Sequence, residues 1–381
     1  MISFNGNTVI KPIIMVTVSM MVLFVIAGML TALKPELRIS SSSINQWSRQ
    51  LDTTAFVHLL GFENQYFKQA IEDTKQQPIS LSSLAFELAT SINPKDPRSL
   101  LGRELPGFSL FDGEIIVAGE GTNYTNMPYE SAPPMEVLLQ EREASIENLE
   151  KLDESKSVTP PALTTDGKKV VYIYATHSRE SYLPHLPEGT KANESFSSEV
   201  NVTTVAEKLA KELENRGIGV QFDPTDFTKL VSEKGKKYHE SYDVSRPAVK
   251  QAMATNRDIT YLIDIHRDSQ PHKITTAKIN EEDYARTMFI VGGEHAKYEQ
   301  NLKLATDLHN LLDEKYPGLS RGITKKQGAG TDGKFNQDLS ENAVLIEMGG
   351  IDNSLEEVYR TVEAIAEVFG EYYWQAEEVN G

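Results

Sequence analysis

Short apolar runs alternate with longer amphipathic runs from about residue 168 to the end of this 381-residue chain. Apolar, β-branched and aromatic residues predict five strands, at 170–175, 218–222, 259–265, 287–291 and 343–346. Helical spacing of apolar residues predicts helices at 198–216, around 249–254, at 296–312, and beyond Asn353 or Ser354. Strands that alternate with helices are typical of a mostly parallel sheet with helices on both faces. We therefore predict an α/β domain over residues 168–381.

Three of the predicted strands end in residue types that bind metal ions. The stretch VVYIYATHSRESY places His177 and Glu180 directly after the first strand. The third strand ends in His266, and the fifth ends in Glu347. Because the carboxyl ends of parallel strands meet at one edge of a sheet, these side chains are expected to converge on one crevice. For His177 and Glu180 alone, a capping or salt-bridging pair is the alternative.

The convergence predicts a zinc site without sulfur ligands, because the chain has no cysteine. Imidazole nitrogens and a carboxylate oxygen suit zinc, so His177, Glu180 and His266 are the expected ligands. The fourth position would hold water, whose pKa zinc lowers to about 7. Glu347 is the candidate catalytic residue, as the base that takes a proton from this water and passes it to a leaving nitrogen.

Some of these assignments have competitors. Glu194 and Glu199 lie at or just before the start of the following predicted helix, so either could replace Glu180 as the third ligand. Glu347 could instead cap a helix or form an ion pair.

Arg267 is a second candidate catalytic residue. Its guanidinium could bind a substrate carboxylate or stabilise an oxyanion, and a surface ion pair with Asp268 is the alternative. Asp264 and Asp268 flank the second histidine and could orient it by hydrogen bonding, as carboxylates do around many metal ligands. A solvated turn is the alternative for these two residues.

A charge-free apolar stretch at 12–33 is long enough to cross a bilayer as a helix. It predicts a transmembrane anchor that follows a short cytoplasmic segment, 1–11, and a cleaved signal peptide is the alternative. Residues 34–154 are predicted to form a mainly helical extracytoplasmic region with loop and strand at 106–117, and the Ser-, Thr- and Pro-rich stretch 155–167 is predicted to be a linker. The expected location is the cell membrane, crossed once, with the zinc domain outside the cytoplasm.

The charge of the chain limits its partners. The formal net charge is −17, and the sequence pI is about 5.0. Nucleic acid is therefore not an expected partner, because binding to phosphates needs a positively charged surface.

Three sequence segments carry a family resemblance. ATHSRESY, DIHRDS and IEMGGIDN, in this order, resemble the stage II sporulation protein P family of endospore-forming bacteria. The resemblance covers residues 168–375, and the N-terminal anchor fits the same layout. Zinc amidases of the N-acetylmuramoyl-L-alanine amidase type share the pattern more loosely.

The resemblance implies a zinc-dependent peptidoglycan hydrolase. Members of the family cleave the muramoyl-L-alanine amide, and also the cross-links between stem peptides, at the sporulation septum during engulfment. Stage II sporulation proteins D and M are the implied partners. His177 and His266 match the two motif histidines, and Glu180 and Glu347 lie in matching motifs. Amidases of the looser group take their carboxylate ligand from the start of the next helix, near Glu199, so the third ligand stays open.

Two other functions fit parts of the pattern. A metallocarboxypeptidase that trims peptidoglycan stem peptides would use the same ligands, with Arg267 holding a terminal carboxylate. A non-catalytic scaffold of a septal membrane complex would retain the site without using it. Intact stem peptides in a digest would indicate the amidase, and shortened peptides would indicate the carboxypeptidase.

Overall fold

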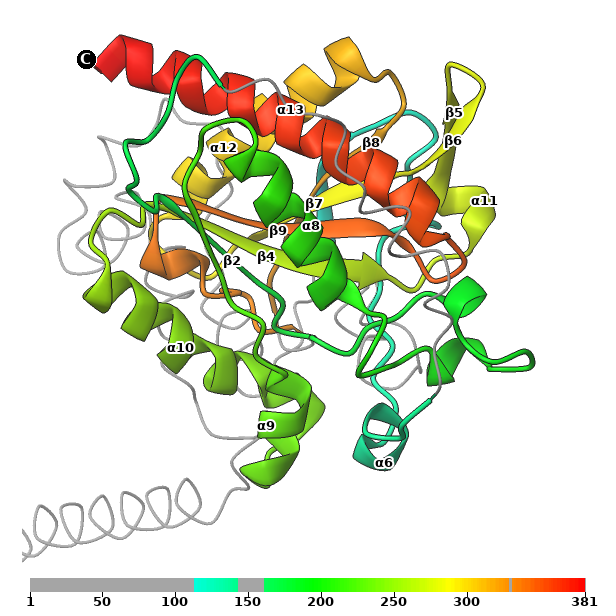
Figure 1. Cartoon of the computed structure of the whole chain (residues 1–381). Coiled ribbons are helices and arrows are strands. Elements are labelled where there is room, and N and C mark those ends of the chain that lie inside the picture. The colour runs from blue at the N-terminus through cyan, green and yellow to red at the C-terminus, as the bar shows by residue number, and fades with distance from the viewer. Residues whose placement is uncertain (1–112, 143–160, 329–330, 381) are drawn as a thin grey trace, which may run out of the picture. The chain divides into compact units, whose positions relative to one another are not determined.

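A seven-stranded sheet forms the centre of the computed structural model, which describes residues 113–142, 161–328 and 331–380 (Figure 1). These residues belong to one compact unit, 86–381. In spatial order the strands are β1 (Gly113–Ala118), β8 (Ser320–Lys326), β7 (Thr287–Gly292), β9 (Asn342–Gly350), β4 (Tyr261–Asp268), β2 (Val171–Tyr174) and β3 (Val220–Phe222). A separate hairpin consists of β5 (Thr276–Ile279) and β6 (Glu282–Ala285).

The sheet is mixed but mostly parallel, as predicted. Strands β3, β2, β4 and β9 are parallel neighbours, and β7 is parallel to β8. β7 is antiparallel to β9, and β1 is antiparallel to β8. The five strands that the sequence predicts for the α/β domain are all present, and the loop and strand predicted at 106–117 overlap β1, whereas β8 and the hairpin were not predicted. The predicted site requires the carboxyl ends of only β2, β4 and β9, and these three strands do run in parallel.

Helices cover both faces of the sheet, which confirms the predicted α/β architecture (Figure 1). On one face lie α8 (Val202–Glu214), α12 (Tyr298–Lys315) and α13 (Leu355–Asn380). On the other face lie α9 (Phe227–Glu233) and α10 (Ser241–Thr255). Shorter helical turns are α6 (Met135–Leu138), η4 (Leu183–His185), η5 (Ala192–Glu194), η6 (Tyr238–Glu240), α11 (His272–Thr275) and η7 (Gln337–Leu339).

Successive side chains along a strand point alternately to these two faces. In β2, Val171 and Ile173 pack with α8 and α13, whereas Tyr172 and Tyr174 pack with α9 and α10.

The N-terminus of helix α8 shows how local chemistry sets the boundary of an element. This N-terminus is fixed by Asn201, whose side chain accepts a hydrogen bond from the Thr203 N–H at 2.8 Å. Helix α8 therefore begins later than the predicted position 198.

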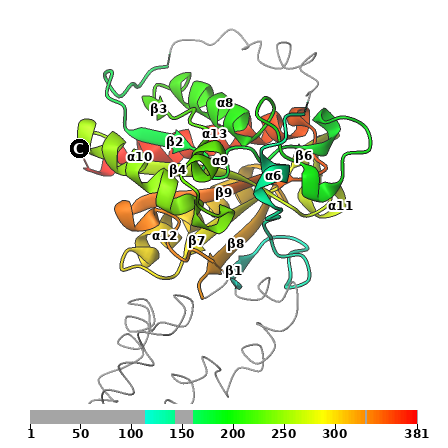
Figure 2. The same cartoon turned by 90° about the horizontal axis from the view of Figure 1, so that it is seen from below.

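The predicted domain start at residue 168 needs correction. Strand β1, from the region before the predicted linker, pairs with β8 and forms the edge of the sheet (Figure 2). Leu138 of α6 is fully buried against Phe196 and Tyr238. The domain therefore includes residues 113–142. The Ser-, Thr- and Pro-rich stretch at 155–167 suggested a boundary because composition does not reveal pairing between distant strands.

None of the helices in the described part of the chain is long and apolar enough to cross a membrane. The predicted anchor at 12–33 and the predicted helices of residues 34–112 lie outside the described residues.

Candidate metal centre

The predicted site residues come together beside β2, β4 and β9. His177 and Glu180 lie in the tight turn after β2, where the Glu180 N–H donates to the His177 carbonyl at 3.0 Å. His266 lies within β4 and Glu347 within β9, and the two residues are direct partners in the parallel register. Both strands therefore continue past the predicted ends, so strand geometry decides where the side chains point.

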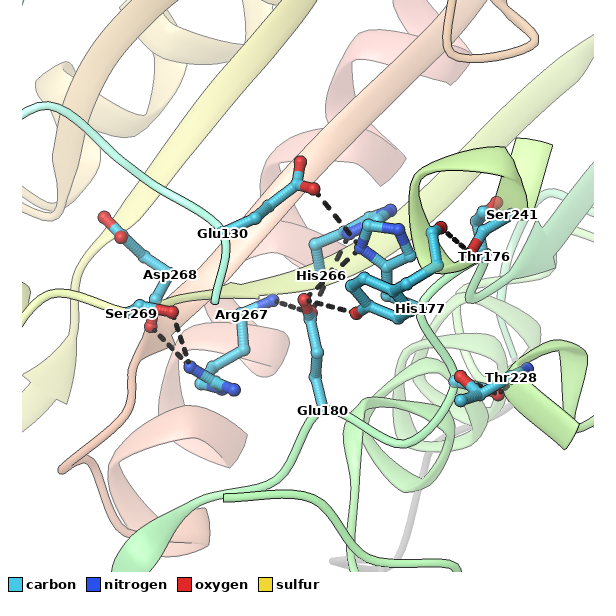
Figure 3. A network of polar contacts seen from close by, with 12 residues as sticks. Glu130, Thr176, His177, Glu180, Thr228, Ser241, His266, Arg267, Asp268 and Ser269 are labelled. Atoms are coloured by element: carbon cyan, nitrogen blue, oxygen red, sulfur yellow. Dashed lines mark hydrogen bonds and ion pairs between the residues drawn. The ribbon is translucent and has the colours of Figure 1, made fainter. Parts of the chain in front are cut away.

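His177, Glu180 and His266 form a buried cluster with metal-binding chemistry (Figure 3). One ligand atom from each lies within 4.8 Å of the others, and no side chain is more than 3% exposed. His177 Nδ1 is 3.4 Å from Glu180 Oε1, and His266 Nδ1 is 3.8 Å from Glu180 Oε2. Neither Nδ1 has a hydrogen-bond partner among the described residues. Buried polar atoms are rarely left unsatisfied, and one metal ion would satisfy both nitrogens.

A backbone N–H holds Glu180 in place, and an aromatic ring holds His177. The Arg267 N–H donates to Glu180 Oε2 at 2.9 Å, and the His177 ring stacks on Tyr238 with centroids 4.3 Å apart. Burial alone would raise the pKa of Glu180, but the adjacent His177 and His266 rings hold it below its usual range. Glu180 therefore remains a carboxylate in a buried setting, which favours a cation beside it.

Asp264 orients His266. Its Oδ1 is 3.2 Å from His266 Nε2, and Tyr242 Oη lies 3.2 Å from the same nitrogen. Because the Tyr242 hydroxyl also donates to Asp264 at 3.1 Å, the natural arrangement has the His266 Nε2–H donating to the carboxylate. The Nδ1 lone pair then faces Glu180. Asp264 accepts two further hydrogen bonds from Thr176, so it is fixed as well. This agrees with the role that the sequence suggested for Asp264.

Glu347 is a second buried carboxylate next to the cluster. Its side chain is 2% exposed, and its Oε2 accepts no hydrogen bond from the described residues. Burial raises the pKa of Glu347 to about 8, although the charges of His266 and Lys326 oppose the rise. A carboxyl group with these properties can accept and return a proton near neutral pH.

The guanidinium of Arg267 lies away from the cluster. This differs from both roles that the sequence suggested for it, contact with substrate and a surface ion pair with Asp268. Neighbouring residues of a strand point to opposite faces, and because His266 is inside β4, Arg267 points away from it. The guanidinium is buried, donates to the Ser195 carbonyl and to Ser269 Oγ, and lies 6.0 Å from the Phe196 ring (Figure 3). Only its backbone N–H reaches the site.

Three other acidic residues also lie elsewhere than the sequence suggested. Asp268 forms a buried ion pair with Arg321 and does not contact a histidine. The carboxylate of Glu194 lies 3.4 Å from the Lys191 N–H, and Glu199 is exposed. Neither glutamate belongs to the metal-binding group found among the described residues.

Several residues that line the site were not predicted from the sequence. Tyr238 and Tyr242 come from η6 and α10, Glu130 comes from the loop after β1, and Lys326 ends β8. Lys326 could have been found only by predicting β8. The sequence of β8, SRGITKK, contains one large aliphatic residue, so no hydrophobic pattern predicts a strand there.

The fold and the site define a class: a mixed α/β protein with a buried His–Glu–His cluster of metal-binding type. Residues 95–370 match the family described as stage II sporulation protein P. The chain is also 48% identical over 382 aligned residues to stage II sporulation protein P of Bacillus subtilis (strain 168). The alignment covers 100% of this chain and 95% of the relative. The chain therefore belongs to the stage II sporulation protein P family.

The search of solved structures found a more distant similarity. The CwlD amidase from Clostridioides difficile, solved in complex with the GerS lipoprotein, is 15% identical and aligns with a TM-score of 0.35. The alignment covers 55% of this chain and 98% of that chain.

Proposed function

We propose that this protein is a zinc-dependent peptidoglycan hydrolase that cleaves the muramoyl-L-alanine amide and also the cross-links between stem peptides. One observation carries the proposal. Two buried imidazoles turn unpaired Nδ1 atoms toward one carboxylate, and a second buried carboxylate lies on the adjacent strand. Membership of a sporulation protein family supports a role in remodelling the cell wall during sporulation.

In this proposal the cluster residues bind the metal, and Glu347 acts as the base. His177, Glu180 and His266 would hold the zinc, as the neutral imidazoles and the carboxylate of this donor set suit. Zinc bound there would supply Lewis-acid chemistry, lowering the pKa of a water ligand to about 7 and polarising the substrate carbonyl. Glu347 would take the proton from the attacking water and return it to the leaving nitrogen. The neighbouring pair His266 and Glu347 in the β4–β9 register places this base beside the ligands.

Arg267 supports the site through its backbone. Its N–H donates to Glu180, while its guanidinium binds backbone and side-chain oxygens on the other side of β4. We therefore assign Arg267 a positioning role. The carboxypeptidase alternative loses support as a result, because Arg267 was its candidate for holding a terminal carboxylate.

We place the protein in the cell membrane at the sporulation septum, with the site outside the cytoplasm. The apolar stretch at 12–33 supports an N-terminal anchor. Family membership supports action during engulfment, together with stage II sporulation proteins D and M.

Digestion of purified peptidoglycan by the full-length protein in detergent tests the reaction. Products are identified by mass spectrometry for the wild type and for Glu347→Gln, which is close in shape but cannot act as a base. We expect intact stem peptides from the wild type, and a rate at least about 100-fold lower from Glu347→Gln, in line with the usual contribution of a general base.

The control is Glu363→Gln, a change on α13 that does not involve the cluster. It should digest peptidoglycan like the wild type. Peptides shortened from their carboxyl end would indicate the carboxypeptidase. A wild-type protein that binds zinc and releases no product would favour the scaffold.

A further inference from the structure

A further carboxylate, Glu130, reaches the cluster from the segment before the predicted linker (Figure 3). Glu130 Oε2 is 3.7 Å from His177 Nδ1. This is the same nitrogen that faces Glu180 Oε1 at 3.4 Å, and it has no hydrogen-bond partner among the described residues. Glu130 therefore lies on the side of His177 that would face a metal ion.

The spacing of these atoms fits a shared metal ion. Two donors on one tetrahedral zinc lie about 3.4 Å apart when each bond is about 2.1 Å long. Three pairs have separations close to this value: 3.4 Å for His177–Glu180, 3.7 Å for His177–Glu130 and 3.8 Å for His266–Glu180. Glu130 is therefore near the group of His177, Glu180 and His266, through its contact with His177. Direct hydrogen bonds would bring the same atoms nearer, to about 2.7–2.9 Å for a charged pair.

The segment that carries Glu130 is fixed to the sheet. Its backbone forms hydrogen bonds with the last residue of β4 and with the two residues that follow it. These are Tyr129 N–H to Asp268 at 3.1 Å, Ser269 N–H to the Tyr129 carbonyl at 3.1 Å, and Gln270 Nε2 to the Met127 carbonyl at 2.7 Å. Arg321, paired with Asp268, also donates to the Asn126 carbonyl. The position of Glu130 is thus coupled to the strand that supplies His266.

The ammonium group of Lys326 forms an ion pair with the other oxygen of Glu130. Its Nζ is 3.7 Å from Glu130 Oε1, and its side chain is 15% exposed. Glu130 itself is 31% exposed, against 3% or less for His177, Glu180 and His266. Glu130 is therefore on the solvent side of the cluster, with one oxygen directed to the lysine and the other to the histidine.

We propose that Glu130 is a fourth residue of the metal centre, whose carboxylate completes the donor set formed by His177, Glu180 and His266. This inference rests on the proposed zinc site. Because Glu130 is the most exposed of the four, it is the donor that would have to yield its position to the water and substrate that the proposed reaction needs.

Metal binding by the full-length protein in detergent tests this role. Zinc affinity is measured by competition with a chromogenic chelator for the wild type, Glu130→Gln and Glu130→Ala. Glu136→Gln, an exposed carboxylate on the same segment, is the matched control. Visible absorption of the cobalt-substituted proteins reports the donor set directly, and circular dichroism confirms that each variant is folded.

We expect both Glu130 variants to bind zinc at least about tenfold more weakly, since changes even outside the donor set cost 10–100-fold. Their cobalt spectra should change in band position and intensity, whereas Glu136→Gln should match the wild type. Unchanged affinity would overturn the inference, and so would weaker binding with an unchanged cobalt spectrum. Either result would leave the proposed function intact, whereas a wild type without metal affinity would remove both.

Discussion

Asp264 determines which nitrogen of His266 faces the cluster. It contacts Nε2 at 3.2 Å and is itself fixed by Thr176, whose N–H and hydroxyl donate at 2.9 and 2.8 Å. A carboxylate that accepts the ring N–H fixes the tautomer and makes the opposite nitrogen a better metal ligand. Asp264 therefore acts on the site without belonging to the cluster.

Replacing Asp264 with Asn should weaken zinc binding by about 10–100-fold, because the amide accepts the ring N–H less strongly and also offers a competing donor. Chelator competition measures the effect. Asp258→Asn, an exposed change just before β4, is the control and should retain wild-type affinity. Equal affinities of Asp264→Asn and the wild type would contradict the orienting role.

Pairing between strands controls the site at the scale of elements. β4 and β9 are in register through His266 and Glu347, and the register then shifts, with Asp268 opposite Gly350. Gly349 makes this shift possible at φ +74°, where a Cβ atom would be only 2.8 Å from the Ala285 side chain. A Cβ on Gly350 would be 2.3 Å from the Gln270 carbonyl. At both glycines the chain itself therefore approaches closely.

The ion pair between Asp268 and Arg321 connects β4 to β8 and to the segment that carries Glu130. Both side chains are at most 1% exposed. Arg321→Met should therefore lower the free energy of unfolding by about 3–5 kcal/mol, because it leaves a buried carboxylate without its partner. Denaturant unfolding measures this change.

A surface ion pair provides the comparison. Arg360→Met removes a partner of Glu282, which is 57% exposed, and should cost less than about 1 kcal/mol. Similar losses of unfolding free energy for the two variants would contradict the stabilising role of the Asp268–Arg321 ion pair.

At the scale of the whole molecule, most of the sheet and the centre of the site could be predicted. Buried parallel strands have recognisable apolar sequences, and parallel strands bring their carboxyl ends together, so His177, Glu180, His266 and Glu347 could be grouped from sequence. The orientation of Arg267 could not, because it depends on how far β4 continues. Only where the strand continues through Arg267 does alternation set its side chain on the face opposite to that of His266.

A strand was predicted near 106–117, but its pairing with the main sheet and the contribution of this segment to the site could not be predicted. β1 is a short edge strand, GEIIVA, and it pairs with a partner far along the chain. Glu130 lies in a loop whose sequence has no periodicity, and its position depends on hydrogen bonds between backbone atoms of distant residues. Long-range pairing of this kind leaves no local pattern in the sequence.

Zinc content of the purified full-length protein tests the central claim most directly. Elemental analysis compares the wild type with His177→Ala and His266→Ala, and His239→Ala, which removes an exposed histidine, is the control. We predict about one zinc ion per chain for the wild type and the control, and little or none for the two cluster variants, since a zinc site needs three or four protein ligands. A wild type without zinc, or cluster variants that retain it in full, would contradict the account.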